Sequence, residues 1–446
     1  MNLFNAYDLR GRIPEDINEK IAYKIGRAYC EVYQPRTIAV GFDVRLESPI
    51  VSNALMQGFV DGGANVNNIG LCGTEEVYFA TFNYELDGGI MVTASHNPNG
   101  YSGMKLVGRE SRPISADTGL FDIKHLVETR DYSNAETSLG SIQKQSDKSA
   151  YINHLLSYID LKSLTPLKIL VNPGNGGAGI VLEQLENHLP FNFIYINREV
   201  NGNFPNGVPN PLLFENREST AIAVRESGAD LGIAWDVDFD RCFFFDADGR
   251  FIESCYIVSL LAEIMLSKTP NARIVHDPRS VWIIQESMNK HSGKSIQSKC
   301  GHTYVKDVMR SNNAVYGGEM SGHHYFRNFS HCDSGMIPWL LIIELMHHSG
   351  KSLKELLDKK IEAYPCSGEI NFNIEDPKKA FKRVKDHFFS MDGKFEDIDG
   401  ISYSFDEWRF NLRASNTEPL VRLNVETKGD KDLLEKKVDE LSILLL

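Results

Sequence analysis

The sequence lacks the features that mark secreted and membrane-spanning proteins. Its seven cysteines are odd in number, scattered along the chain and without a CxxC pair, which indicates reduced thiols and no disulfide framework. No apolar run reaches the ~18 residues that a membrane-spanning helix needs. The first residues, MNLFNAYDLRGR, contain no apolar signal core. We therefore expect a cytoplasmic protein.

Basic charge is also scarce. The chain has 47 Lys and Arg against 60 Asp and Glu, for a formal net charge of −13. Nucleic-acid backbones need basic surface, so we expect no nucleic-acid partner. A local cluster of Arg and Lys can still bind a small phosphate, because salt screens charges beyond about 8 Å. We expect small-molecule partners, no membrane, and no obligatory protein partner.

The length and the order of elements predict a multidomain α/β protein. At roughly 100–200 residues per domain, the chain of 446 residues has three or four. Buried strands alternate with helical segments as far as residue 365, and the polar segment 132–149 is interpreted as a surface connection. We predict three consecutive α/β domains with mixed sheets and a smaller C-terminal α+β domain around a central cleft. The predicted boundaries are 1–145, 146–249, 250–365 and 366–446.

A first polar loop, TASHNPN, follows the predicted strand Gly89–Thr93. Asn97-Pro98 turns the chain away from helix. Ser95 is a candidate nucleophile beside a possible base, His96. A cation at Lys105 would stabilise a phosphoryl oxygen or assist proton removal. The alternative is a plain turn.

The loop DVDFDR, after the predicted strand Ala229–Trp235, carries three carboxylates in five residues. Two unit charges ~4 Å apart repel by about 4 kcal/mol at an effective dielectric near 20, so the three need a cation. Oxygen-only ligands suit Mg²⁺ or Ca²⁺, and a solvated acidic turn is the alternative. An EF-hand counted from Asp236 fails, because Arg241 and Ala247 stand where Gly and Glu are required. A haloacid dehalogenase-type phosphatase is disfavoured, because Asp240 stands where that class has Thr or Val.

Two further loops carry polar groups that suit a sugar phosphate. GGEMSGHH combines a carboxylate, a hydroxyl and an imidazole, which can hydrogen-bond vicinal sugar hydroxyls. RASNTEP supplies many donors, and its Arg offers a planar fork for phosphate oxygens. Each loop alone is also compatible with an ordinary turn.

The segment Gly174–Gly179 fits the dinucleotide pattern GxGxxG, with Glu199 twenty residues beyond its last glycine. A lone match of this kind is weak, and we interpret the segment as a strand-to-helix turn that needs small residues. A dinucleotide-dependent oxidoreductase is the alternative from another functional class.

Together the loops resemble the α-D-phosphohexomutase superfamily, specifically its phosphomannomutase branch. TASHNP, DVDFDR, GEMSGHH and RASNTEP occur in that family's order, and AYDLRG, GMK and GHTYVK are weaker matches. The resemblance covers essentially the whole chain. It implies phosphorylation of Ser95 and one Mg²⁺ per chain. The implied metal ligands are Asp236, Asp238, Asp240 and Ser95 through a phosphoserine oxygen.

The resemblance also implies roles for residues around the substrate. Arg10, His96 and Lys105 are expected near the phosphoryl group and Arg241 beside the metal. The residues implied for the sugar are Arg279, Gly301, His302, Glu319, Ser321 and His323. The residues implied for the phosphate that is not transferred are Arg413, Ser415, Asn416 and Thr417. Cys300 departs from the family, which more often has Thr before Gly-His, so the shape of that loop stays open.

The implied activity is that of a phosphomannomutase, which interconverts mannose 6-phosphate and mannose 1-phosphate. A hexose 1,6-bisphosphate would be its intermediate and activator, and its product would supply GDP-mannose and polysaccharide synthesis. A dual-specificity phosphomannomutase/phosphoglucomutase, the identity of the general base and the oligomeric state all stay open.

Overall fold

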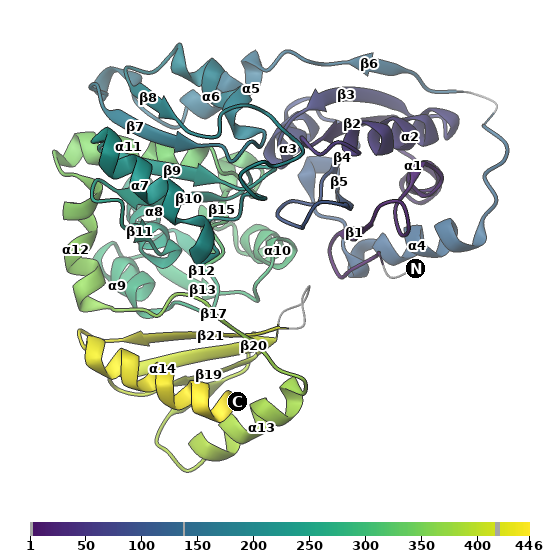
Figure 1. Ribbon diagram of the computed structural model, residues 1–446. Helices are drawn as coiled ribbons and strands as arrows, with labels where there is room; N and C mark the ends of the chain where they lie inside the picture. The colour runs from purple at the N-terminus through teal and green to yellow at the C-terminus, as the bar shows by residue number, and fades with distance from the viewer. Residues whose placement is uncertain (1–2, 137–138, 415–419) are drawn as a thin grey trace. The chain divides into compact units, whose positions relative to one another are not determined.

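The computed structural model describes residues 3–136, 139–414 and 420–446 (Figure 1). Three residues of the predicted phosphate loop, Ser415, Asn416 and Thr417, lie outside the described residues. The chain divides into two compact units. Unit 1 comprises Met1–Phe251 with Asn328–His348, and unit 2 comprises Ile252–Arg327 with Ser349–Leu446.

The first sheet of unit 1 has the strand order β1-β5-β4-β2-β3-β6. Its strands are β1 (Leu9–Arg12), β2 (Thr37–Phe42), β3 (Asn65–Leu71), β4 (Gly88–Val92), β5 (Tyr101–Gly108) and β6 (Ile142–Lys144). The central strands β4, β2 and β3 are parallel, whereas β5 runs antiparallel to both β4 and β1. Its helices are α1 (Glu19–Tyr33), α2 (Ser48–Asp61), α3 (Thr74–Asn83) and α4 (Leu120–Thr129). Buried apolar residues of α1, α2, α4 and the strands form one core.

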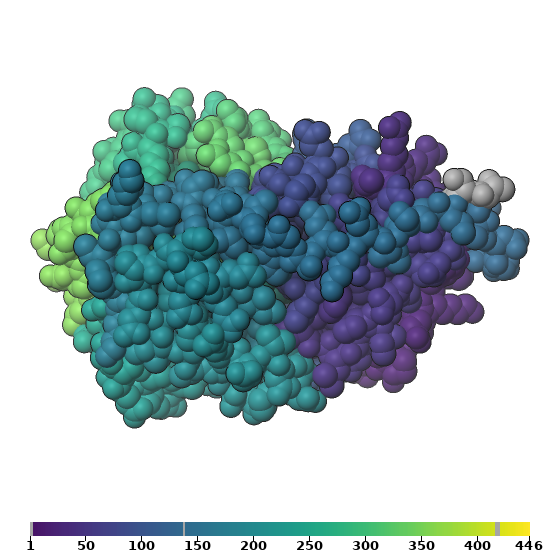
Figure 2. Space-filling view, turned by 90° about the horizontal axis from the view of Figure 1, so that it is seen from above, coloured from purple at the N-terminus to yellow at the C-terminus, as the bar shows by residue number. Residues whose placement is uncertain are grey.

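The strand β6 lies in the segment that the sequence marks only as a polar connection. Its three residues are all exposed, and it pairs in parallel with Val66–Asn68 of β3. Figure 2 shows this stretch of chain on the surface of the unit. Backbone hydrogen bonds at the sheet edge hold the strand, so composition alone could not reveal it.

The second sheet of unit 1 has the order β11-β10-β9-β7-β8. Its strands are β7 (Lys168–Asn172), β8 (Asn192–Tyr195), β9 (Leu231–Trp235), β10 (Cys242–Asp246) and β11 (Phe251–Ile252). The strands β8, β7 and β9 are parallel and β10 is antiparallel to β9. The other elements here are α5 (Ser149–Leu156), α6 (Ala178–Glu186), α7 (Glu218–Ser227), β16 (Cys332–Asp333) and α11 (Ile337–Ser349).

Unit 2 begins with a third mixed sheet, in which the strands follow the order β13-β12-β14-β15. These strands are β12 (Arg273–His276), β13 (Lys294–Gln297), β14 (Tyr316–Gly318) and β15 (His324–Phe326). The strand β12 is parallel to β13 and β14, and β15 is antiparallel to β14. The helices are α8 (Ser254–Lys268), α9 (Trp282–Lys290), α10 (His302–Asn312) and α12 (Leu353–Ala363).

The C-terminal part of unit 2 is an antiparallel sheet in the order β17-β21-β20-β19-β18. Its elements are β17 (Ile370–Asn373), α13 (Pro377–Phe388), β18 (Lys394–Glu396), β19 (Ile401–Ser404), β20 (Trp408–Ala414), β21 (Leu420–Thr427) and α14 (Lys431–Leu445). Apolar residues of α13 and α14 share one core with the strands, and Asp376 and Asp430 cap the two helices. The predicted fold class, three mixed α/β sheets and a C-terminal α+β part, is confirmed.

One arrangement recurs at the loops that carry polar groups. The first three follow β4, β9 and β14, and each leads into a neighbouring antiparallel strand, β5, β10 or β15. The fourth segment lies between the antiparallel strands β20 and β21. Each set of polar groups thus belongs to a segment that connects two paired antiparallel strands, and the pairing fixes both ends of that segment. None of the described helices is long and apolar enough to cross a membrane.

Candidate active site

The Ser95 loop is held by side chains that follow strands β4 and β2 of the first sheet. Ser95 is 3% exposed and has a positive φ of 47°, an uncommon conformation for a non-glycine residue. Its N–H donates to Thr93 Oγ1 at 2.8 Å, and that hydroxyl donates to Asp43 Oδ2 at 2.7 Å. The guanidinium of Arg45 donates to the carbonyl oxygens of Ser95 and Pro98 at 2.7 and 3.0 Å. These contacts offset the cost of the strained conformation.

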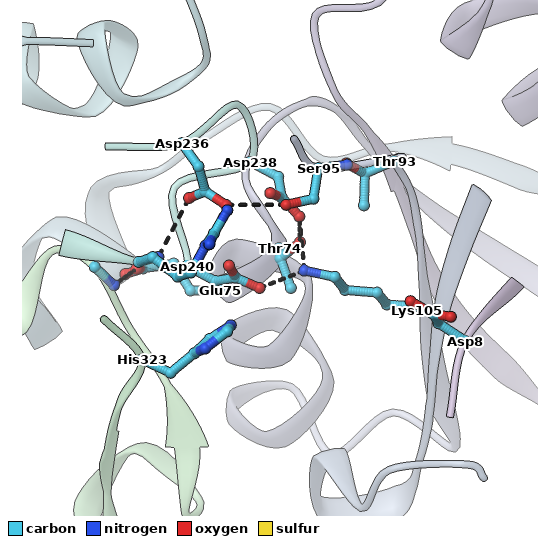
Figure 3. Close-up of polar contacts among 12 residues, drawn as sticks. Asp8, Thr74, Glu75, Thr93, Ser95, Lys105, Asp236, Asp238, Asp240 and His323 are labelled. Atoms are coloured by element: carbon cyan, nitrogen blue, oxygen red, sulfur yellow. Dashed lines mark hydrogen bonds and ion pairs between the residues drawn. The ribbon is translucent and has the colours of Figure 1, made fainter. Parts of the chain in front are cut away.

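Three buried carboxylates face the serine (Figure 3). Ser95 Oγ donates to Asp236 Oδ2 at 2.9 Å. Asp236, Asp238 and Asp240 are each at most 1% exposed, and their potential ligand atoms lie within 4.8 Å of one another. Among the described residues, Asp238 Oδ1 is buried without a hydrogen-bond partner. An oxygen-only donor set with an unpaired carboxylate oxygen fits a hard divalent cation.

Two basic side chains partly offset these carboxylates. Lys105 Nζ lies 2.8 Å from Asp238 Oδ2 and also forms an ion pair with Asp240. Arg241 Nε lies 2.8 Å from Asp236 Oδ2. Lys105 stands opposite Met91 in the β4–β5 ladder, so the return strand β5 delivers it beside the loop that β4 delivers.

The aspartates respond differently to burial. Burial raises the pKa of Asp236. Burial and the charge of Asp238 raise the pKa of Asp240 well above its usual range. Burial also opposes ionisation of Asp238, but the charge of Lys105 and hydrogen bonds from Lys105 and Thr74 outweigh it and lower the pKa. Three carboxyl groups thus share only two basic neighbours, which disfavours ionisation of all three at once, and a bound cation would favour their charged forms.

His96 does not have the character of a strong base in this environment. Its Nδ1 accepts a hydrogen bond from Arg241 Nη2 at 2.7 Å and lies 3.1 Å from Ser95 Oγ. Burial and the charges of Arg241 and Arg10 lower the pKa of His96 well below its usual value. The imidazole is therefore neutral near pH 7, and Asp236 is the nearer acceptor for the serine hydroxyl.

Arg10 also contacts the Ser95 loop. Its Nη1 donates to the carbonyl of Ala94 at 2.9 Å and to Asn97 Oδ1. Its Nε pairs with Asp8 Oδ2 at 2.8 Å, which orients the guanidinium. Of the predicted residues, unit 1 thus brings together Ser95 with Arg10, His96, Lys105, Asp236, Asp238, Asp240 and Arg241.

The glycine-rich turn after β7 packs against the aspartate loop. The N–H of Gly177 donates to Val237 O at 3.1 Å. A Cβ at Gly176 would lie 2.8 Å from the same oxygen. The turn therefore needs small residues for close backbone approach, as the scaffold interpretation of GxGxxG requires.

Unit 2 holds a second cluster of buried charges, centred on Arg279. Its guanidinium lies 2.6 Å from Asp277 Oδ2, 2.9 Å from Glu369 Oε2 and 3.6 Å from Glu319 Oε1. Asp277, Cys300 and Glu319 bring potential ligand atoms within 4.8 Å of one another. Arg279 supplies positive charge to all three carboxylates of this cluster.

The predicted sugar loop is ordered by contacts within unit 2. Glu319 Oε1 accepts the N–H of Gly301 at 2.9 Å, and Tyr325 donates to its other oxygen. Ser321 Oγ lies 2.9 Å from His323 Nδ1. The predicted loop at Gly301-His302 is in fact the start of a helix, because α10 begins at His302.

Three arginines of unit 2 converge on one carboxylate. Besides Arg279, Arg413 Nη2 lies 3.7 Å and Arg422 Nη1 lies 3.5 Å from the carboxylate of Glu369. The Nε of Arg413 is buried and has no hydrogen-bond partner in the described part of the chain. Arg413 therefore keeps donor capacity that an anion could use.

Comparison with known proteins assigns the family. Models of the phosphoglucomutase/phosphomannomutase family match alpha/beta/alpha domain I at residues 1–133, domain II at 149–249, domain III at 254–364 and the C-terminal domain at 369–443. The chain belongs to the phosphoglucomutase/phosphomannomutase family. It is therefore an isomerase of the phosphohexomutase kind, an intramolecular phosphotransferase.

Curated relatives of this phosphohexomutase match along its full length. A protein from Xanthomonas campestris pv. campestris named "Phosphohexose mutases" is 54% identical over 442 residues, covering 99% of this chain and 98% of the relative. The phosphomannomutase of Escherichia coli strain K12 is 51% identical over 451 residues, covering 100% and 99%. A solved structure of a phosphoglucomutase/phosphomannomutase family protein from Burkholderia thailandensis has a TM-score of 0.88 at 28% identity, covering 99% and 96%.

Several residues that contact the candidate site residues were not predicted. Asp8 stands within AYDLRG, which the sequence already singled out, and Asp277 stands two residues before the predicted Arg279; each pairs with the arginine beside it. Thr74 and Glu369 carry no local signal: Thr74 begins an ordinary helix, and Glu369 immediately precedes a short strand. Their contacts join segments far apart in the sequence, which a local pattern does not encode.

Proposed function

We propose that this phosphohexomutase is a phosphomannomutase, which interconverts mannose 6-phosphate and mannose 1-phosphate through phosphoserine at Ser95. The observation that carries the proposal is the hydrogen bond of the Ser95 hydroxyl to one of three buried aspartates that retain an unpaired carboxylate oxygen. Relatives named phosphomannomutase, about half identical over the whole chain, support the choice of sugar.

In the proposed reaction, a hydroxyl oxygen of the hexose phosphate attacks the phosphorus of phosphoserine. The new O–P bond replaces the bond from phosphorus to Ser95 Oγ, and the hydroxyl proton ends on Ser95 Oγ. The product is hexose 1,6-bisphosphate. It turns end for end and returns its other phosphoryl group to Ser95, which completes the isomerisation. Added hexose 1,6-bisphosphate would activate the enzyme by phosphorylating Ser95.

Asp236, Asp238 and Asp240 would hold one Mg²⁺ per chain, joined by a phosphoserine oxygen of Ser95. Such an ion would supply charge stabilisation for the transferring phosphoryl group. Lys105 and Arg10 stand within the same buried cluster and add positive charge for its oxygens. Arg241 orients Asp236, and His96, neutral and bound to Arg241, fits a positioning role.

The substrate side of the proposal rests on unit 2. Glu319 and Ser321 would bind the sugar hydroxyls, with His323 beside them. Arg413 would grip the phosphate that is not being transferred. The residues proposed to complete these sites are Arg279, Gly301, His302, Ser415, Asn416 and Thr417. We also propose domain boundaries at 145/146, 249/250 and 365/366, a cytoplasmic location without an obligatory protein partner, and a role in supplying GDP-mannose for polysaccharide synthesis.

A dual-specificity phosphomannomutase/phosphoglucomutase is the second candidate. The similarity to the Xanthomonas protein, whose name covers phosphohexose mutases in general, favours it. Comparing kcat/KM for mannose 1-phosphate and glucose 1-phosphate separates the two. A strong preference for mannose supports the phosphomannomutase, and equal values support dual specificity.

The proposed phosphorylation of Ser95 is tested on the purified enzyme. Purified enzyme should carry phosphate on Ser95 by intact mass and peptide mapping, and more of it after incubation with glucose 1,6-bisphosphate. Ser95→Ala should lose nearly all activity, whereas Ser157→Ala, at an exposed serine of the same unit, should retain it. Full activity in unphosphorylated Ser95→Ala would disprove the proposal.

A further inference from the structure

Thr74, the first residue of α3, makes two hydrogen bonds to a single residue of the aspartate loop. Its N–H donates to the carbonyl oxygen of Asp238 at 3.0 Å, and its hydroxyl donates to Asp238 Oδ2 at 2.6 Å (Figure 3). The side chain is completely buried. One residue of the first sheet's helix thus holds both the backbone and the carboxylate of Asp238.

The two oxygens of Asp238 have different surroundings. Oδ2 accepts from Thr74 and, at 2.8 Å, from Lys105 Nζ. Oδ1 is buried and has no hydrogen-bond partner among the residues that the structure describes. Because two donors fix Oδ2, the carboxylate cannot rotate freely, and the direction of Oδ1 is set as well. Oδ1 is the oxygen left for a cation.

The two donors to Oδ2 differ in their effect on a cation. Lys105 is positively charged and shared with Asp240, so it neutralises carboxylate charge and competes with a metal ion. The hydroxyl of Thr74 is neutral. It orients the carboxylate and leaves its negative charge in place, as outer partners of metal-binding carboxylates do.

The start of α3 is itself fixed against the loop. A Cβ at Gly73 would lie 2.2 Å from the ring of Phe239, so helix and loop approach as closely as a glycine allows. The N–H of Gly73 donates to Glu76 Oε1 at 3.0 Å and closes the helix cap. Glu75 accepts from Ser334 Oγ at 2.8 Å and Met336 N at 3.2 Å. These contacts fix the start of α3 and therefore the position from which the Thr74 hydroxyl donates its hydrogen bond.

We propose that Thr74 is a positioning residue for the metal ion, which directs Oδ1 of Asp238 toward the cation through its hydrogen bond to Oδ2. The inference rests on the proposed function, because it takes a divalent ion at the aspartate loop as given. It predicts that Thr74 acts on metal affinity and not on hexose phosphate binding.

The test is calorimetric titration of the full-length, metal-stripped protein with Mg²⁺, repeated with Mn²⁺ by electron paramagnetic resonance. Thr74→Val should weaken Mg²⁺ affinity by roughly tenfold or more, in the range seen when outer-shell partners of ligands are removed. At saturating Mg²⁺, the KM of Thr74→Val for mannose 1-phosphate should equal that of the wild type. Thr74→Ser, which keeps the hydroxyl, should restore the affinity.

The matched control is Thr81→Val on the same helix. Thr81 is equally buried, but its hydroxyl donates to Val77 O at 2.8 Å, within the helix. Its loss should leave Mg²⁺ affinity unchanged. If Thr74→Val does not fold, Thr74→Ala replaces it, because Ala removes the hydroxyl without placing a methyl group against the carboxylate.

The outcomes separate this inference from the function it rests on. If wild type binds Mg²⁺ and the folded Thr74 variants without a hydroxyl bind it equally well, Thr74 has no positioning role. Equal weakening by Thr74→Val and Thr81→Val would also overturn the inference, because it would indicate general loosening of α3. If wild type itself binds no divalent ion, the metal part of the proposed function fails, and the inference falls with it.

Discussion

The charge cluster at Ser95 in unit 1 and the cluster at Glu369 in unit 2 both pair buried carboxylates with basic side chains, but in different ratios. In unit 1, three aspartates pair with only two basic side chains, Lys105 and Arg241. In unit 2, three arginines contact the carboxylate of Glu369, and one of them, Arg279, also pairs with Asp277 and Glu319. Among the described residues, the first cluster leaves Asp238 Oδ1 without a hydrogen-bond partner. The second cluster leaves the Nε of Arg413 without one.

The difference indicates what each cluster is ready to receive. Buried charges are costly unless they are paired, so an unpaired oxygen marks a place for a cation and an unpaired N–H marks a place for an anion. A phosphohexomutase needs both, because one phosphate is transferred while the other is held. Three variants test the comparison, from the largest expected effect to the smallest.

Lys105→Met should give the largest effect. It leaves Asp238 and Asp240 without their shared counterion, and breaking a buried ion pair from one side costs about 3–5 kcal/mol. Urea unfolding in the presence of a chelator should show this loss. Excess Mg²⁺ should restore part of the stability, because the ion replaces the missing charge.

Lys360→Met in unit 2 is the control for Lys105→Met. Lys360 pairs with Glu263 at 2.6 Å, and both residues belong to unit 2. Mg²⁺ should not restore the stability that Lys360→Met loses. If Mg²⁺ does not stabilise Lys105→Met more than this control, the first cluster is not short of a cation.

Arg413→Ala should give the second effect. A hydrogen bond to a charged group contributes roughly 1.5–3 kcal/mol, so kcat/KM should fall by about one to two powers of ten. Arg413→Lys should rescue this in part, because an ammonium cannot reproduce the planar fork. Steady-state kinetics with mannose 1-phosphate measures kcat/KM of both variants. Arg383→Ala, in helix α13 of the same C-terminal part, serves as the control. An unchanged kcat/KM for Arg413→Ala would place the phosphate elsewhere.

Glu369→Gln should give the smallest effect. Its carboxylate competes with a bound phosphate for Arg413 and Arg422, while Gln still offers Arg279 an acceptor oxygen. We expect KM for mannose 1-phosphate and the inhibition constant of inorganic phosphate to fall by roughly fivefold, about 1 kcal/mol. The exposed Glu362→Gln is the control. A rise in KM would mean that Glu369 orients the arginines and does not compete with phosphate.

The sequence by itself determined which polar side chains the loops carry and the order of the loops along the chain. Ser95, the three aspartates, Glu319 and Arg413 were all predicted, because each stands in a short contiguous motif after or between strands. The alternation of buried strands and helices likewise predicted the fold class. A polar edge strand such as β6 was missed, because only backbone pairing with β3 holds it.

Only the tertiary structure decided which residues hold the reactive groups in place. Thr74 and Asp238 are 164 positions apart, and Arg279 and Glu369 are 90 positions apart. The sequence around a threonine at the start of a helix, or around a glutamate before a strand, does not indicate that the residue has such a distant partner. Strand order and packing bring these segments together, and burial then turns an ordinary hydrogen bond or ion pair into one that orients a functional group.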